Sequence, residues 1–159
     1  MKILPSSDKR FRMTDSDTIC RYIHSRYGVM TLADPTETES HNYLFARPRN
    51  SAGFPIDVCF AYCLHDNQQF YLGIVERGQF RVTRNSRFEP DTAIVKGAAY
   101  ITKMAYSPKL AKNSPMILTH SGHCARCGRP LTSEFGIKYG FGRKCIRHVV
   151  TGQEFVSST

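Results

Sequence analysis

A stretch in the middle of the chain alternates between apolar and polar positions with a period of two residues. Apolar side chains occupy every second position of residues 54–64, and the alternation resumes in residues 70–74 and 80–82. Such a period predicts β-strands with one buried face. Polar segments at 65–68 and 77–78 predict tight reversals between them. The pattern therefore indicates an antiparallel β-meander whose inward face carries the even-numbered side chains of residues 54–64.

The opposite face of this meander combines a tyrosine with arginines, namely Tyr71, Arg81 and, in the following turn, Arg84 and Arg87. Two interpretations are open. Such a face can hold single-stranded nucleic acid by stacking and phosphate contact. The preferred interpretation is the ordinary solvated face of a half-buried sheet, because this alternation is the default in antiparallel sheets.

Apolar residues at helical spacing flank the meander on both sides. They predict a helix over residues 15–27, which Gly28 is placed to end. A second helix is predicted over residues 92–105, where small residues allow close approach to the sheet. Short strands are expected at 29–32 and 116–119. These elements predict an α+β protein in which two helices cover an antiparallel sheet.

The last third of the chain carries two pairs of potential metal ligands. They are Cys124-x2-Cys127 and, after seventeen residues, Cys145-x2-His148. Tetrahedral zinc requires four sulfur or nitrogen donors, and two close pairs separated by a loop supply them. The first pair fits a tight turn, and the second fits the first turn of a helix. Two further histidines stand beside the first pair and could replace the fourth donor: His120 and His123.

A turn with two ligands, a short hairpin and a helix with two more is the layout of a treble-clef or ribbon-like zinc module. The alternative is a set of cysteines without metal. No secretory signal opens the sequence, so we expect a reducing, cytoplasmic compartment, where CxxC pairs bind metal or carry out redox chemistry. Pro130 interrupts any helix directly after the first pair, which argues against a thioredoxin-like motif. Structural Zn²⁺ is the favoured interpretation.

The same residues resemble an uncharacterised phage and bacterial family of small zinc-finger-like domains. The family pattern is C-x-x-C-G-R-x-L-T, a spacer and G-x-G-P-x-C, and the chain matches it at residues 124–132 and 140–145. The chain departs from the pattern at Arg143, where the family has proline, and at residues 135–136, where the family has Glu-Ser. The resemblance implies a metal site and a phage-like origin. It implies no particular activity.

Length and composition limit the domain organisation. The chain has 159 residues, and 41% of them are hydrophobic, which is enough for a compact core. No stretch is long and apolar enough to span a membrane. We expect an α+β domain at residues 1–106, a basic linker and strand at 107–118, and a zinc-binding module at 119–159. Oligomeric state is left open.

Positive charge is concentrated on the C-terminal part of the chain. The formal net charge is +9. From residue 103 onward nine basic residues stand against two glutamates, a balance of +7, whereas the first 102 residues hold 13 basic and 11 acidic residues, a balance of +2. This asymmetry favours an anionic partner, with nucleic acid first and an acidic protein surface second.

Three functions remain in view. The first is a non-enzymatic protein that binds DNA or RNA phosphates through the zinc module. Its candidate contact residues are Arg126, Arg129, Lys138, Tyr139, Arg143, Lys144 and Arg147. The second is a phage accessory protein that binds and modulates a host protein, such as a polymerase or a defence nuclease. The third, a nuclease, is disfavoured because the sequence shows no paired carboxylates and a closed zinc site leaves no coordination position for water.

Overall fold

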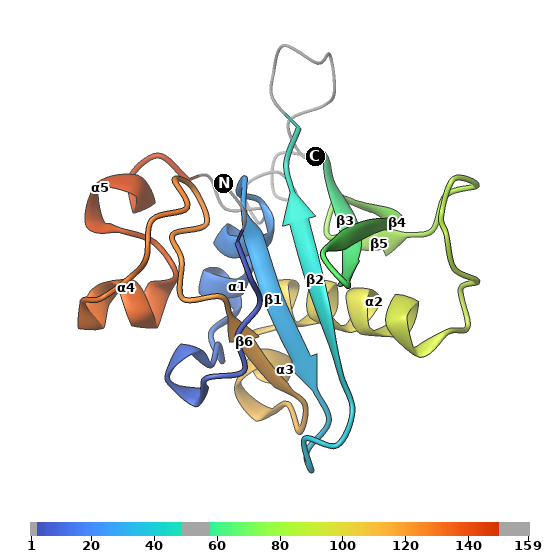
Figure 1. Ribbon diagram of the computed structural model, residues 1–159, viewed down its shortest axis with the longest axis horizontal. Helices are drawn as coiled ribbons and strands as arrows, with labels where there is room; N and C mark the ends of the chain where they lie inside the picture. Colours follow the sequence, from blue (N-terminus) through green and yellow to red (C-terminus); the bar gives the residue numbers. More distant parts are fainter. Residues whose placement is uncertain (1–2, 49–57, 150–159) are drawn as a thin grey trace.

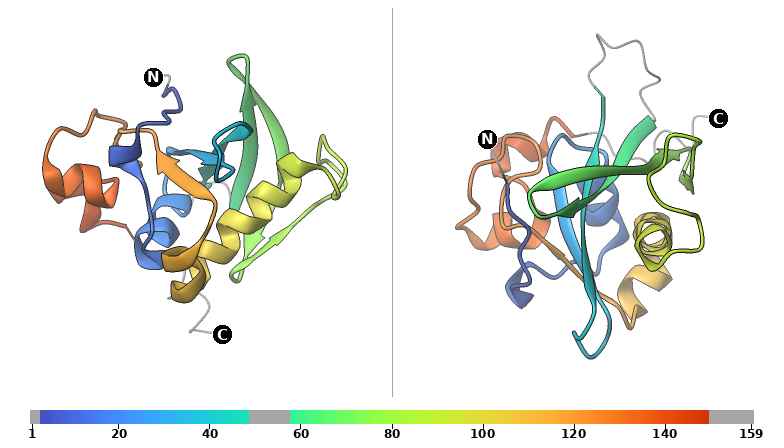
Figure 2. Two further views of the ribbon diagram at one scale, coloured as in Figure 1. Left: turned by 90° about the horizontal axis from the view of Figure 1, so that it is seen from below. Right: turned by 45° about the vertical axis from the view of Figure 1, so that its right-hand side comes forward.

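The computed structural model describes residues 3–48 and 58–149, and it contains one curled antiparallel sheet with helices on one face (Figures 1 and 2). The sheet has six strands in the order β5-β4-β3-β2-β1-β6. The strands are β1 (Gly28–Ala33), β2 (Ser40–Ala46), β3 (Val58–His65), β4 (Gln68–Glu76), β5 (Gln79–Arg81) and β6 (Ile117–His120). The first five follow one another as neighbours, which confirms the predicted meander. Residues 54–57 of the predicted strand lie outside the described residues.

The helices are short apart from one. They are η1 (Lys9–Phe11), α1 (Ser16–Ile23), α2 (Ala93–Tyr106), α3 (Pro108–Asn113), α4 (Glu134–Tyr139) and α5 (Arg143–Ile146), with η1 a 3-10 helix. None of those in the described part of the chain has the length and apolar character that a membrane crossing requires. The prediction for α2 is confirmed, and Thr92 caps it by accepting from the Val95 N–H. The segment expected as a plain linker contains α3, because Ser107 caps a turn that Pro108 can begin.

The first helix is shorter than predicted. Asp15 caps α1 through the Thr18 N–H at 3.0 Å, but the helix ends at Ile23, and Gly28 opens strand β1. A Cβ at Gly28 would lie 2.6 Å from the carbonyl oxygen of Tyr22. The glycine is therefore required by the close approach of strand and helix, and it does not serve as a helix stop.

Two tight turns join the strands of the central meander. Asp66 and Asn67 have φ values of 49° and 65°, and Arg77 and Gly78 have values of 51° and 78°. Left-handed backbone at both central residues matches the right-handed twist of the flanking strands, as in type I′ hairpins. The predicted reversals at 65–68 and 77–78 are confirmed.

The predicted inward face of β3 is wrong. Cys59, Ala61 and Cys63 are the buried side chains beneath the helices, whereas Phe60 and Tyr62 are half-buried on the opposite face. The reason is volume, because the neighbouring strand β2 turns two large rings inward. Tyr43 pairs with Cys63 and Phe45 pairs with Ala61, so large residues face small ones across the strands.

A register shift also breaks the alternation between β3 and β4. The shift lies between Ala61 and Tyr62, and it pairs Tyr62 with Tyr71 and Phe60 with Ile74. Ile74 consequently shares the outer face with the two tyrosines, although the sequence pattern placed it with Leu72. A period-two reading cannot detect such a shift, because one extra residue reverses the parity of all that follow.

Helix α2 approaches the sheet closely at one glycine. A side chain at Gly97 would collide with the hydroxyl of Tyr43, which donates a hydrogen bond to the Ile94 carbonyl oxygen at 2.7 Å. Figure 1 shows α1 and α2 behind β1 and β2. The small residue Gly97 thus allows the close approach of helix and sheet that was expected for residues 92–105.

The C-terminal module and the sheet share a hydrophobic core. Strand β6 pairs with β1, and Ala125 and Phe141 of the module are fully buried in the same cluster as Tyr22 of α1. Figures 1 and 2 show the module at the end of the molecule opposite to β4 and β5. The module is therefore positioned by packing against α1 and β1.

Candidate metal centre

The first pair of cysteines lies on a tight turn that the local sequence enforces. The Gly128 N–H donates to the Cys124 carbonyl oxygen at 2.8 Å, and the Cys124 N–H donates to the Arg129 carbonyl oxygen at 2.8 Å. Gly128 has a φ of 81°, a conformation that favours glycine. His123 and Pro130 form an isolated antiparallel bridge that closes the turn. The short hairpin expected between the two ligand pairs is wrong, because helix α4 occupies that spacer.

The third cysteine, Cys145, follows a second turn, which comes after a helix that was not predicted. Helix α4 occupies the spacer and ends at Gly140, whose φ is 74°. The Gly140 carbonyl oxygen accepts from the Ala125 N–H at 3.1 Å, which ties the two turns together. Gly142 then opens α5, and Cys145 lies within that single helical turn.

The structure brings three of the predicted ligands together. The sulfur atoms of Cys124, Cys127 and Cys145 lie within 4.8 Å of one another. Tetrahedral zinc, with zinc–sulfur bonds of about 2.3 Å, holds its sulfurs about 3.8 Å apart, so small side-chain adjustments suffice. Within the described residues, this is the one group of three or more His, Cys, Asp and Glu side chains close enough to share a metal ion.

Hydrogen-bond donors favour the thiolate form of Cys124. Burial alone would raise the pKa of the Cys124 thiol, but backbone N–H groups, first that of Gly142, point at its sulfur and lower the pKa. The Gly142 N–H lies 3.5 Å from this sulfur, and the Arg126 guanidinium lies 3.5 Å from that of Cys145. Burial and the adjacent sulfurs raise the pKa of Cys145, which Arg126 opposes. Three crowded thiols with this environment are suited to a cation.

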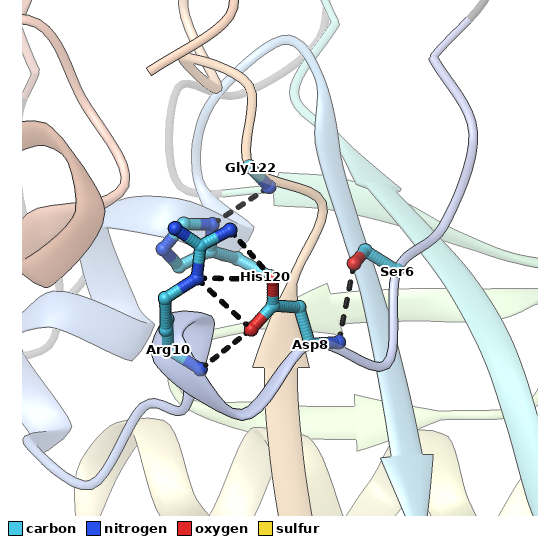
Figure 3. A network of polar contacts seen from close by, with 5 residues as sticks. All are labelled: Ser6, Asp8, Arg10, His120 and Gly122. Carbon is cyan, nitrogen blue, oxygen red and sulfur yellow. Dashed lines mark hydrogen bonds and ion pairs between the residues drawn. The ribbon is translucent and has the colours of Figure 1, made fainter. Parts of the chain in front are cut away.

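His120 has no free nitrogen for a metal. The Gly122 N–H donates to its Nδ1 at 3.0 Å, so Nε2 carries the proton and donates to the Ile137 carbonyl oxygen at 2.7 Å. Figure 3 shows His120 beside the ion pair of Arg10 and Asp8 in the N-terminal segment. The ring is fully buried, so His120 is a packing residue that links β6, the N-terminal segment and α4.

The other two histidines remain outside the sulfur cluster. His123 directs Nδ1 toward the Ser121 carbonyl oxygen at 3.2 Å. His148 is exposed just beyond α5, and its backbone N–H donates to the Cys145 carbonyl oxygen at 3.0 Å. Neither ring joins the group of three sulfurs. The choice of fourth ligand therefore stays a prediction.

The remaining three cysteines are core residues. Cys20, Cys59 and Cys63 are all buried. Burial raises the pKa of the Cys59 thiol well above its usual value, so this thiol stays protonated. These cysteines differ from the metal cluster, in which backbone donors lower the pKa of Cys124.

All six predicted contact cations of the module are exposed. They are Arg126, Arg129, Lys138, Arg143, Lys144 and Arg147. No ion pair within the described residues involves any of them; the ion pairs lie elsewhere, between Lys9 and Glu37 and at similar surface positions. These charges are therefore open to an external anion.

Two aromatic rings lie among these cations. Phe135 and Tyr139 on α4 have ring centroids 4.8 Å apart. The Arg143 guanidinium lies 4.5 Å from the centre of Phe135, and the Lys138 ammonium lies 5.2 Å from the centre of Tyr139. We call these four residues the aromatic row. Phe141, by contrast, is buried in the core.

A long-range contact that the sequence does not signal adjoins the metal site. The backbone N–H groups of Arg26 and Tyr27 both donate to the Ala125 carbonyl oxygen, at 3.1 and 2.6 Å. The Arg26 guanidinium lies 5.1 Å from the centre of the Tyr27 ring. A cation and an aromatic ring are thus fixed beside the first cysteine pair by residues about a hundred positions earlier in the chain.

One family model matches the chain, and it covers the module. Residues 119–150 match a family described as "Family of unknown function (DUF6011)". No curated protein and no solved structure matches the chain. The matched segment contains all three clustered cysteines, so the site lies in the part of the chain that this family shares.

Proposed function

We propose that the C-terminal module holds Zn²⁺ through Cys124, Cys127, Cys145 and His148, and that its basic surface binds nucleic acid. The observation that carries this proposal is the set of six exposed cations in the same module as the sulfur cluster, none of which forms an ion pair within the described residues. The protein acts by binding and catalyses no reaction.

The role assigned to the metal is structural. Helices α4 and α5 have six and four residues, too few to be stable on their own. Zinc held by ligands from both turns would fix the relative positions of these helices, and its binding energy would contribute to folding. His148 lies just beyond α5, three residues after Cys145, and is the proposed fourth ligand.

The proposed contact with nucleic acid has two components. The exposed lysines and arginines neutralise phosphates, which releases counterions and makes affinity fall with salt. The aromatic row supplies ring faces on which bases can stack, and Arg143 already occupies such a face at Phe135. Neither component reads a particular base sequence, so binding is expected to be strong at low salt and weakly specific.

Four protein ligands would close the zinc site, so no coordination position would remain for a reacting water. This supports a non-enzymatic role. The six cysteines are all free thiols, which fits the reducing cytoplasm. An acidic surface of a host protein is the alternative partner, because the same exposed cations would serve it equally well.

The test is binding to short labelled single- and double-stranded DNA and RNA over a salt series. Replacing Arg143, Lys144 and Arg147 together by Ala should weaken binding by about tenfold or more and make the salt dependence shallower. The matched control replaces three exposed lysines of α2 and α3, namely Lys103, Lys109 and Lys112. This control variant loses the same number of positive charges and should retain most of the wild-type affinity for nucleic acid.

Equal losses in both triple variants would show that net charge alone attracts the nucleic acid. No binding at low salt would contradict the proposal and point to an acidic protein partner instead.

A further inference from the structure

A groove of about 820 Å³ lies on the outer face of the sheet, opposite to the helices. Its floor includes Val29 of β1, Leu44 of β2 and Leu64 of β3, and Val29 pairs with Leu44 while Leu64 pairs with Asn42. The N-terminal segment 3–5 and the turn between β3 and β4 form its walls. The groove is thus built from elements that are far apart in sequence and held by the sheet.

Polar groups line the groove in about equal measure with apolar ones. Asn42, Asn67 and Gln69 contribute side-chain amides. The Thr31 hydroxyl donates to the Asn42 Oδ1 at 2.7 Å, which leaves the NH₂ group of Asn42 as a donor. Amides beside an apolar floor are suited to the edges and faces of unpaired bases.

One end of the groove adjoins the metal site. Arg26 and Tyr27 line this end, and both donate backbone hydrogen bonds to Ala125, the residue between Cys124 and Arg126. Arg26 is exposed and lies over the ring of Tyr27. A nucleic acid strand with a phosphate bound at the exposed Arg126 could therefore continue to a second cation, Arg26, and to the ring of Tyr27 at this end of the groove.

The two charged groups of the groove lie on different elements. Among the described residues that line it, Asp66 is the one carboxylate, and it lies in the β3–β4 turn with its oxygen 3.3 Å from His65 Nε2. The Arg26 end carries the opposite charge. The favoured direction of entry is therefore from the module side.

We propose that this groove binds a single-stranded nucleic acid segment that continues from the module, with a base stacked at Tyr27 and a phosphate at Arg26. The inference rests on the proposed function of the module. It adds a preference for single strands, because paired bases hide the edges and faces that the groove would contact. The module would contribute phosphate affinity, and the groove would contribute this preference.

The test compares a 15-nucleotide single strand with the duplex of the same sequence, for wild type and for Tyr27→Ala. Loss of one stacking residue should weaken single-strand binding by about tenfold and leave duplex binding unchanged. Tyr27→Phe keeps the ring and should restore single-strand affinity. The backbone hydrogen bond of residue 27 to Ala125 is available to all three variants. The control variant Asn113→Ala changes an exposed, uncharged residue outside the groove and should alter neither affinity.

The outcomes separate the two proposals. If Tyr27→Ala changes neither affinity, or lowers both equally, the groove proposal is overturned while the module proposal stands. If the triple variant Arg143→Ala, Lys144→Ala, Arg147→Ala binds like wild type, the module proposal fails whatever Tyr27 shows. A folding defect of Tyr27→Ala would appear as a lowered Tm, and Gln69→Ala, at an exposed position on the same groove wall, then provides the single-strand comparison.

Discussion

The ring of Phe141 meets the ring of Tyr22 edge to face, with a centroid distance of 5.9 Å. Both rings are fully buried. Tyr22 belongs to α1, and Phe141 lies between the two glycines that lead from α4 to α5. This contact holds the turn that leads to Cys145, so the geometry of the sulfur cluster depends on the packing of a helix more than a hundred residues away in sequence.

Replacing Gly140 by Ala should destabilise the protein. A Cβ there would lie 2.6 Å from two ring carbons of Tyr22, and the φ of 74° is unfavourable for alanine. Backbone strain and overpacking predict a loss of about 2–4 kcal/mol in the free energy of unfolding. Chemical denaturation of the zinc-loaded protein measures it.

Gly142 supplies the matched control for that substitution. A Cβ at this position meets nothing within 4 Å, and the residue has a φ of −68°. Gly142→Ala keeps the backbone N–H that faces Cys124 and should change stability by less than about 0.5 kcal/mol. Similar losses for both alanine variants would show that the close approach to Tyr22 is not the cause.

The turns of the sheet can be predicted from local sequence. The pairing of strands and the choice of buried face cannot, because they depend on residues far apart in the chain. Turn residues at 65–68 and 77–78 specify their reversals through local backbone chemistry, so both could be predicted. Strand β2 was not predicted, and its first residues are polar. The choice of buried face on β3 depends on Tyr43 and Phe45 of the neighbouring strand, which alternation along one strand cannot reveal.

Zinc binding should require the clustered cysteines and none of the core cysteines. Wild type should bind about one zinc per chain, since one sulfur cluster is present in the described residues. Cys145→Ser should lower zinc affinity by about 100-fold or more, because it removes one of the thiolates that hold the metal. Competition with a chelator of known affinity measures this change.

Cys63→Ala is the control for the loss of a thiol. Cys63 is a buried residue of β3 and has no place in the sulfur cluster. The zinc affinity of the Cys63→Ala variant should match that of wild type. A protein that contains no zinc when prepared with the metal present would refute the metal centre.

The fourth ligand can be identified by comparing two histidines. His148→Ala should lower zinc affinity by about 10- to 100-fold, as the loss of a nitrogen donor requires, whereas His123→Ala should leave it nearly unchanged. His123 Nδ1 already lies 3.2 Å from the Ser121 carbonyl oxygen. The opposite order of effects would assign the ligand to His123, and equal small effects would leave a three-cysteine site.

Stability should fall as the pH drops below about 6.5, the usual pKa of an unfolded histidine. Burial lowers the pKa of His120 in the folded protein, so below that pH the unfolded chain binds more protons and is favoured. Protonation would also place a proton between Nδ1 and the Gly122 N–H, which now donates to it. Denaturation at pH 7.5 and 5.5 measures the effect.

The contribution of His120 is isolated by comparing variants. His120→Gln should lose part of the difference in unfolding free energy between the two pH values, whatever its absolute stability. His65→Gln changes an exposed histidine and should keep the whole difference. Equal pH dependence in wild type and His120→Gln would contradict this role of the buried ring.

The cysteines of the candidate site could be predicted from the sequence, whereas the elements that surround them could not. The spacing of Cys124, Cys127 and Cys145 is a local signal, and the structure confirms their proximity. Helix α4 was missed, because a short hairpin was expected between the two ligand pairs. The contact of Arg26 and Tyr27 with Ala125 arises from tertiary packing, so no periodicity or motif in the sequence predicts it.

The central claim is that the metal holds the basic surface in the form that binds nucleic acid. The most direct measurement compares the affinity of zinc-loaded and zinc-free protein for one labelled 15-nucleotide strand at fixed salt, with zinc content determined in both samples. We expect affinity to fall by about tenfold or more when zinc is removed and to return when it is restored, because binding of structural zinc contributes to folding. Unchanged affinity in protein shown to be free of zinc would contradict the claim.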